Sequence, residues 1–197
     1  MFKKILLVCV SVLLTQTLSA NEQKQLEEHF LSRIDNVISV VQNKELDKEK
    51  RNASIIKILT PMFDFELMAK LSLGKKYKKL STEDKKRFVD LYVLRMKNSY
   101  SSKIDAYNDE KLEVKEILQA KKNRIALVTD LVSSKETLKI VYKFYKPKQA
   151  KKSKDTWLIY DVEILGVSIL KTDKAQFREY LQTKSIQELM DTLAQKS

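Results

Sequence analysis

The spacing of apolar residues changes near residue 108, and this change limits the fold more than any other feature of the chain. Before it, apolar residues recur three and four positions apart, as on one face of a helix. After it they alternate with polar residues, as in strands with one buried face. Near the C-terminus the helical spacing returns. This order predicts an α+β domain in which N-terminal and C-terminal helices pack on one face of an antiparallel sheet.

Six helices are predicted, four before the sheet and two after it. The first covers residues 21–42. Short polar side chains favour the ends of the others, because they accept hydrogen bonds from backbone N–H groups that the first turn leaves free. Proline and glycine favour helix ends, since one disfavours the helical conformation of the preceding residue and the other tolerates a left-handed one. The candidate caps are Asp47, Asp64, Ser81 with Asp84, Asp173 with Gln176, and Ser185 with Glu188, and the candidate stops are Pro61 and Gly74.

Four strands are predicted between residues 108 and 170, joined as an antiparallel meander by short connections. The last is the stretch WLIYDVEILGVSIL, residues 157–170, which we interpret as one strand containing Gly166. A glycine inside a strand indicates a bulge, a bend or a close approach to the backbone. The alternating apolar residues of the other three are Leu112, Val114 and Leu118; Ile125, Leu127 and Leu131; and Leu138, Ile140, Tyr142 and Phe144.

Residues 1–20 have the pattern of a secretory signal peptide. Two lysines precede a ten-residue apolar run, Ile5–Leu14, and cleavage can follow Ala20. The run is too short to span a bilayer. We therefore expect an exported protein with residues 21–197 as a single domain, and an uncleaved anchor is the alternative. The only cysteine lies inside the leader, so the exported domain depends on its core rather than on disulfides.

The chain is basic, with 38 lysines and arginines against 26 acidic residues. Two clusters stand out. One reading is that they are solvated faces, and the other is that they are attracted to anionic lipid surfaces. Nucleic acid is not an expected partner of an exported chain. The clusters are Lys75, Lys76, Lys78 and Lys79 with Lys85, Lys86 and Arg87, and then Lys146, Lys148, Lys151, Lys152 and Lys154.

Residues that would carry catalysis are scarce. His29 is the only histidine, and nothing in the sequence pairs it with a nucleophile or a second zinc ligand. Asp64 with Glu66 is best explained as a charged helix N-terminus. Asp161 with Glu163 indicates a strand face that meets solvent. We expect binding rather than enzymatic chemistry, with no cofactor and no metal.

Three segments together resemble the MlaC, or toluene-tolerance, family of periplasmic phospholipid carriers. They are FDFELMAKLSLGKKY (63–77), STEDKKRFVDLYVLRMKNSY (81–100) and WLIYDVEILGVSILKTDKAQF (157–177). The matching residues are Phe63, Asp64, Phe65, Met68, Leu73, Gly74, Arg87, Phe88, Tyr100, Tyr160, Asp161, Val162, Gly166, Val167, Ser168, Gln176 and Phe177. Tyr77 departs from an expected tryptophan, and Asp173-Lys174 from a frequent Tyr-Arg pair. A role of the family's Tyr-Arg pair in closing the site or contacting a partner therefore cannot be transferred to Asp173-Lys174, because the residue types differ.

The resemblance implies a periplasmic carrier that moves phospholipid between an outer-membrane lipoprotein complex and the lipid-binding subunit of an inner-membrane ABC transporter, maintaining outer-membrane lipid asymmetry. It also implies an apolar pocket that holds the acyl tails between sheet and helices, and we expect a monomer. A periplasmic interaction or lipoprotein-chaperone module without phospholipid is the alternative. Gly166 would let the last strand bend at the pocket wall. The other candidate lipid-binding residues are Met68, Leu71, Phe88, Leu91, Tyr92, Met96, Ile140, Tyr142, Val162, Ile164 and Val167.

Overall fold

The computed structural model describes residues 3–104, 111–152 and 154–195. Within these residues the helices are α1 (Lys3–Gln42), α2 (Lys48–Leu59), α3 (Phe65–Leu73), α4 (Thr82–Ile104), α5 (Ile169–Thr183) and α6 (Ile186–Gln195), with short 3₁₀ helices η1 (Thr60–Met62) and η2 (Gly74–Lys79). The strands are β1 (Lys111–Lys121), β2 (Arg124–Val132), β3 (Thr137–Tyr145), β4 (Leu158–Ile164) and β5 (Val167–Ser168). The predicted α+β class is confirmed.

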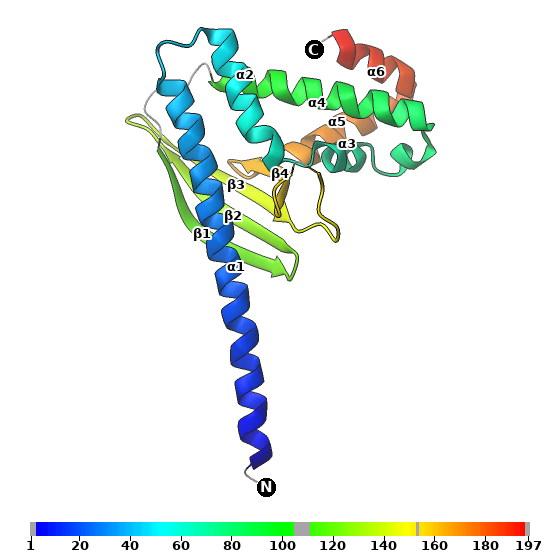
Figure 1. Ribbon diagram of the computed structural model, residues 1–197. Coiled ribbons are helices and arrows are strands. Elements are labelled where there is room, and N and C mark those ends of the chain that lie inside the picture. Colours follow the sequence, from blue (N-terminus) through cyan, green and yellow to red (C-terminus); the bar gives the residue numbers. More distant parts are fainter. Residues whose placement is uncertain (1–2, 105–110, 153, 196–197) are drawn as a thin grey trace.

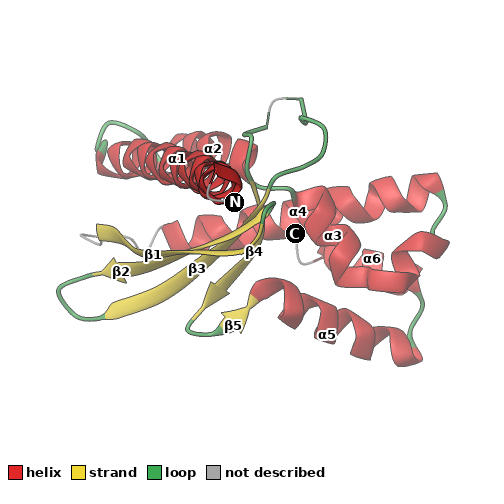
Figure 2. Ribbon diagram, turned by 90° about the horizontal axis from the view of Figure 1, so that it is seen from below, coloured by secondary structure: helices red, strands yellow, loops and turns green. Residues whose placement is uncertain are grey.

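The strands form one antiparallel sheet in which spatial order follows chain order, β1-β2-β3-β4-β5. The sequence predicts four strands, and the fifth is a two-residue addition at the edge. The pairing of Tyr142 with Leu127 on one side and Val162 on the other places apolar side chains on a common face. Helix α1 crosses the sheet, and Figure 2 shows α1 and α2 together on one side of it.

Aromatic packing fixes α1 on this face. The ring centroid of Phe30 lies 4.8 Å from that of Tyr142 and 5.9 Å from that of Phe144, both on β3. Such tilted and edge-on pairs add to the stabilisation that burial of the rings provides. The first helical face predicted from the sequence is therefore the one that covers the sheet.

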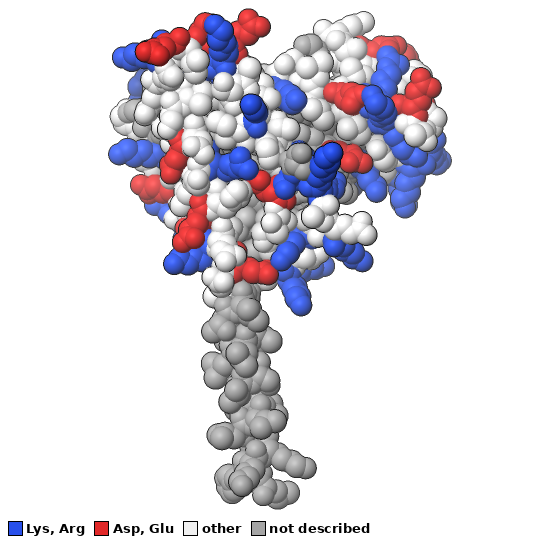
Figure 3. Space-filling view, in the orientation of Figure 1, with Lys and Arg blue, Asp and Glu red and all other residues white. Residues whose placement is uncertain are grey.

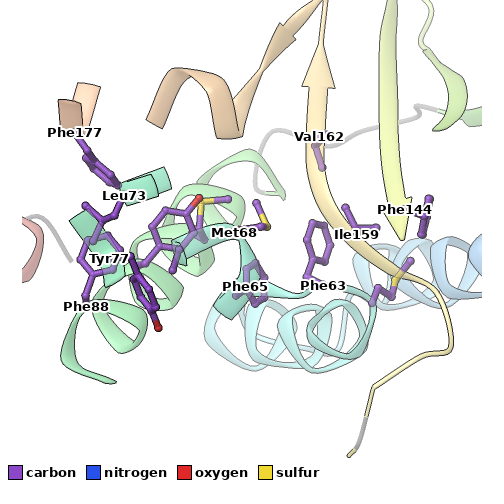
Figure 4. Packing of buried hydrophobic residues seen from close by; sticks show 14 of the residues in the cluster. Phe63, Phe65, Met68, Leu73, Tyr77, Phe88, Phe144, Ile159, Val162 and Phe177 are labelled. Carbon is purple, nitrogen blue, oxygen red and sulfur yellow. The ribbon is translucent and has the colours of Figure 1, made fainter. Parts of the chain in front are cut away.

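Helices α3, α4, α5 and α6 form a second part of the same core, beyond the end of the sheet (Figure 1). The ring of Phe177 lies edge-on to those of Phe88 and Tyr92, with centroids 5.9 and 6.4 Å apart. Figure 4 follows the buried side chains from this group past Phe63 to Phe144 on the sheet. One apolar core thus joins the helical layer to the sheet.

Most predicted helix caps are present. The side chains of Asp47 and Asp64 accept hydrogen bonds from the backbone N–H groups of Lys50 and Leu67. Gly74, with φ +57°, ends α3. The other confirmed caps are the reciprocal pairs of Ser81 with Asp84 and of Ser185 with Glu188.

One predicted strand face is wrong beyond the middle of β1. A register shift between Val114 and Glu116 inserts an extra residue, so that Ile117 rather than Leu118 pairs with Leu127 of the core face. Leu118 is 45% exposed as a result. A bulge changes which side chains face inward without changing the alternating sequence, so periodicity alone does not reveal it.

The interpretation of residues 157–170 as one strand is also wrong. The chain reverses at Leu165-Gly166, where both residues have positive φ, +49° and +80°. This is the backbone of a type I′ hairpin turn. Ser168 then caps α5, accepting a hydrogen bond from the backbone N–H of Lys171. Helix α5 consequently begins at Ile169, five residues before the start that a cap at Asp173 would give.

Helix α1 continues through Ala20 without a break, and the signal-peptide boundary stays a prediction. In the part of the chain that the structure describes, no helix has both the length and the apolar character that a membrane crossing requires.

Candidate functional site

The apolar face of the sheet is larger than the surface that the helices bury. Several of its side chains pack against the core and yet stay partly exposed, among them Leu138, next to the β2–β3 turn. Burial of the phenol raises the pKa of Tyr142 to about 12, consistent with an apolar surrounding. The partly buried apolar side chains on this face are Leu112, Val114, Ile117, Leu131, Leu138, Tyr142 and Ile164.

A cavity of about 400 Å³ opens where α1 passes the end of β3. Its floor is apolar, and charged side chains stand around its mouth. This is the usual form of a small-molecule site, an apolar interior with few polar groups. The floor is formed by Leu26, Phe30, Met62, Phe144 and Trp157, and the rim by His29 and the charged side chains of Glu22, Lys146, Lys154 and Asp155.

The rim charges are paired across the cavity mouth and fasten α1 to the segment that connects β3 and β4. The partly buried Asp155 carboxylate contacts His29 Nε2 and an Arg33 guanidinium nitrogen, each at 2.9 Å. Lys146 Nζ lies 3.1 Å from Glu22. His29, which the sequence leaves without a partner, thus belongs to a network of polar contacts at the mouth.

Asp64 fixes the same connecting segment to the N-terminus of α3. The carboxylate is buried, caps Leu67, accepts a hydrogen bond from the Tyr145 hydroxyl, and lies 2.8 Å from Lys151 Nζ. Burial raises the pKa of Asp64, but the hydrogen bonds from Lys151, Tyr145 and Leu67 outweigh this effect and hold the pKa below its usual value.

Lys154 is held nearby by backbone oxygens. Its ammonium group donates to the carbonyl oxygens of Thr60 (2.5 Å) and Phe63 (2.9 Å), and burial lowers its pKa. Lys151 and Lys154 therefore stabilise the fold, although the sequence places both in a basic surface cluster.

The expectation that the Asp161 face meets solvent is wrong. Asp161 is buried and accepts hydrogen bonds from the Ser168 hydroxyl (2.8 Å) and from the backbone N–H of Leu170 (3.1 Å). Lys143 Nζ lies 3.2 Å away. The Y-D-V and G-V-S motifs thus join β4 to the start of α5.

The predicted lipid-binding residues fall into four places: the sheet face, a surface groove, the core between the helices, and the hairpin turn at Gly166. Ile140, Tyr142, Val162 and Ile164 lie on the apolar sheet face, where lipid contact stays a prediction. Leu71 lines a separate surface groove, described below, and Leu91 is partly buried against the core. The members packed inside the hydrophobic cluster of the helices are Met68, Phe88, Tyr92 and Met96.

Gly166 and Val167 lie in and next to the exposed hairpin turn. A Cβ atom added to Gly166 would meet nothing within 4 Å, and Val167 is 61% exposed. The glycine is required by the positive φ of the turn. The interpretation that Gly166 lets a strand bend at a pocket wall is therefore wrong.

Sequence reasoning missed the residues that line the cavity. Leu26 and Phe30 lie on the apolar stripe of the first helix, which indicates burial but cannot separate a filled core from a cavity wall. Trp157, the only tryptophan, directly follows the basic loop and was the available signal. Met62 and Phe144 gave no distinguishing signal.

Asp173, a departure from the family pattern, is buried between α4 and α5. It accepts hydrogen bonds from the Tyr92 hydroxyl (2.7 Å) and from Arg95 (2.8 Å). Burial alone would lower the pKa of Arg95, but the contact with Asp173 raises it. The carboxylate is therefore satisfied by partners on α4 and has a structural role.

No group of three or more His, Cys, Asp or Glu side chains among the described residues could hold a metal ion. The fold and the cavity define an α+β protein with an apolar site between a meander sheet and the helix that crosses it. The chain belongs to the MlaC protein family, which it matches over residues 31–195.

A solved structure has a similar fold. It is that of the phospholipid-binding protein from Ralstonia solanacearum in complex with a phospholipid, with a TM-score of 0.72 over 86% of this chain and 94% of that chain. The two sequences are 14% identical, so the similarity concerns the fold. No curated protein sequence matches the chain.

Proposed function

We propose that this protein binds phospholipid, with acyl tails between the sheet and α1. The observation that carries the proposal is an apolar sheet face that leads from the partly exposed Leu138 end of β3 to the cavity beside Phe144. Membership of the MlaC family supports it, as does the similar fold of a protein solved with a phospholipid.

Burial of the tails would hold the ligand strongly. Two tails contain on the order of 30 methylenes, and transfer of each from water is worth about 0.8 kcal/mol. A bilayer offers nearly the same stabilisation, so exchange with a membrane can be close to balanced. Escape into water is strongly disfavoured.

We propose that the tails extend from the cavity beside Phe144 along the partly buried face of β3, and that α1 moves outward from the sheet when lipid is loaded.

We further propose that residues 1–20 direct export and are removed, and that the remaining domain acts in the periplasm as a monomeric carrier without a cofactor. Its partners would be an outer-membrane lipoprotein complex and the lipid-binding subunit of an inner-membrane ABC transporter. Transport between them would maintain outer-membrane lipid asymmetry, with direction supplied by the transporter rather than by any catalysis in this chain.

The test is to export the protein, purify it without detergent, and measure bound lipid by native mass spectrometry and by mass spectrometry of the extract. We expect a stoichiometric phospholipid. Leu26→Trp fills the cavity and should lower the lipid load several-fold, while Leu94→Trp, at a site 44% exposed on α4, should not.

A wild-type protein that stays empty and takes no phospholipid from donor vesicles would contradict the function. A folded Leu26→Trp variant with full lipid load would show that the tails bind outside this cavity. Thermal unfolding of both variants separates these outcomes from misfolding.

A further inference from the structure

A second recess, separate from the cavity under α1, lies between α3 with η2 and α5. It encloses about 760 Å³ and shares no lining residue with that cavity. Its floor is apolar, formed by Leu71, Leu73, Phe177 and Leu181. The cationic side chains around it are Lys70, Lys75, Lys76, Lys78, Lys174 and Arg178. We call this recess the basic groove.

The charges of the basic groove are not neutralised by the protein. No acidic residue lines it, and within the described part of the chain none of Lys75, Lys78 and Lys174 has a carboxylate within ion-pair distance. Lys76 Nζ instead donates to the carbonyl oxygen of Leu181, 2.8 Å away. By contrast, cations at the rim of the cavity under α1 are paired with the carboxylates of Asp155 and Glu22.

The positive surface continues along α5. Lys171, Lys174 and Arg178 are three and four residues apart, so they share one face of the helix. Figure 3 shows Lys and Arg side chains, with Asp and Glu side chains beside them, at the end of the molecule that carries η2 and the start of α4. Like charges on one helix face repel one another, and an external anion would offset that repulsion.

We propose that the basic groove docks the protein on an anionic bilayer surface. Cations around an apolar floor match phosphate headgroups above the first acyl carbons. Lysine dominates the rim, and its hydrated point charge suits reversible attraction to many headgroups better than bidentate recognition of one acidic side chain. The inference rests on the proposed function only in that a lipid carrier must approach a bilayer.

The experiment measures partition of the exported protein onto vesicles of phosphatidylcholine with or without phosphatidylglycerol, by co-sedimentation at low and high salt. Lys75→Gln, Lys78→Gln and Lys174→Gln together should weaken binding to the anionic vesicles about 100-fold, at about five-fold for each lysine. The matched control removes the same charge from the turns of the sheet, with Lys121→Gln, Lys122→Gln and Lys135→Gln, and should weaken binding less than five-fold.

Lipid load is measured on the same preparations, so that an empty protein contradicts the proposed function without deciding this inference. Equal loss in both triple variants would overturn the inference, because net charge alone would explain it. Wild-type protein that ignores anionic vesicles but binds an acidic amphipathic peptide would overturn it in favour of a protein partner.

Discussion

Leu165 occupies a position in the hairpin turn that suits asparagine or glycine. It has φ +49°, is 66% exposed, and packs against little that could offset the strain. We expect Leu165→Asn to raise the free energy of unfolding by about 1 kcal/mol, because Asn-Gly is favoured in type I′ turns. Urea unfolding measures the change. Leu165→Val is the matched control and should lower stability, since a β-branched residue tolerates positive φ poorly.

Asp64 combines a helix cap with a partly buried ion pair. Asp64→Ala should cost about 3 kcal/mol, because the cap is lost and Lys151 keeps only the more distant and exposed Glu66 carboxylate, 3.8 Å away. Asp64→Asn can still cap α3 and should cost less. Urea unfolding at pH 7 compares the two, and equal costs would show that the cap contributes nothing.

The same carboxylate predicts a pH dependence. Its folded pKa lies below the ordinary value of about 3.9. The stability that it contributes is therefore present above that value and is lost as pH falls through the lower, folded pKa. Unfolding midpoints measured from pH 6 to pH 2.5 should fall more steeply for the wild type than for Asp64→Asn. Parallel curves would contradict this assignment.

At the scale of elements, a buried network joins α4 to α5. Asp173→Ala removes the carboxylate that accepts hydrogen bonds from Arg95 and from the Tyr92 hydroxyl, and should cost 3 kcal/mol or more. Tyr92→Phe removes one hydrogen bond and should cost about 1 kcal/mol. A double-mutant cycle with Asp173→Asn measures the coupling, and additive effects would show that the two residues act independently.

The difference between local and distant interactions explains which elements the sequence predicts. Asp47 and Ser81 contact residues three positions away, so their caps follow from spacing alone. By its spacing in the sequence, Asp173 is an equally good candidate for a cap. Only its hydrogen-bond partners on α4, about eighty residues earlier, show that it has another role. The turn at Leu165 was hidden because leucine is rare at positive φ. Likewise, the bulge in β1 does not change the alternation of apolar and polar residues in the sequence.

At the scale of the molecule, the α+β class and the cover of the sheet by α1 could be predicted, since both follow from apolar periodicity. The cavity could not be predicted, because a filled core and the wall of a cavity are built from the same types of side chain. Phe88 and Tyr92 fill space between helices, whereas Phe30 borders a void. Only the relative placement of α1, β3 and the segment before Trp157 distinguishes them.

The attachment of α1 to the rest of the molecule should control ligand exchange. Asp155→Ala removes the carboxylate that holds His29 and Arg33, and we expect faster transfer of a fluorescent phospholipid to acceptor vesicles, by several-fold. Glu22→Gln disrupts only a more exposed pair with Lys146 and should have little effect. Unchanged transfer in Asp155→Ala would mean that ligand leaves by another route.

The sheet order also bears on how the chain reaches its native state. Every strand pairs with its neighbour in sequence, so the sheet can form by closing short loops, which costs little entropy and favours rapid folding. The contact of Arg33 with Asp155 closes a loop of more than a hundred residues. We therefore expect the meander to form early and α1 to dock late, which would leave the apolar face briefly open during every folding event.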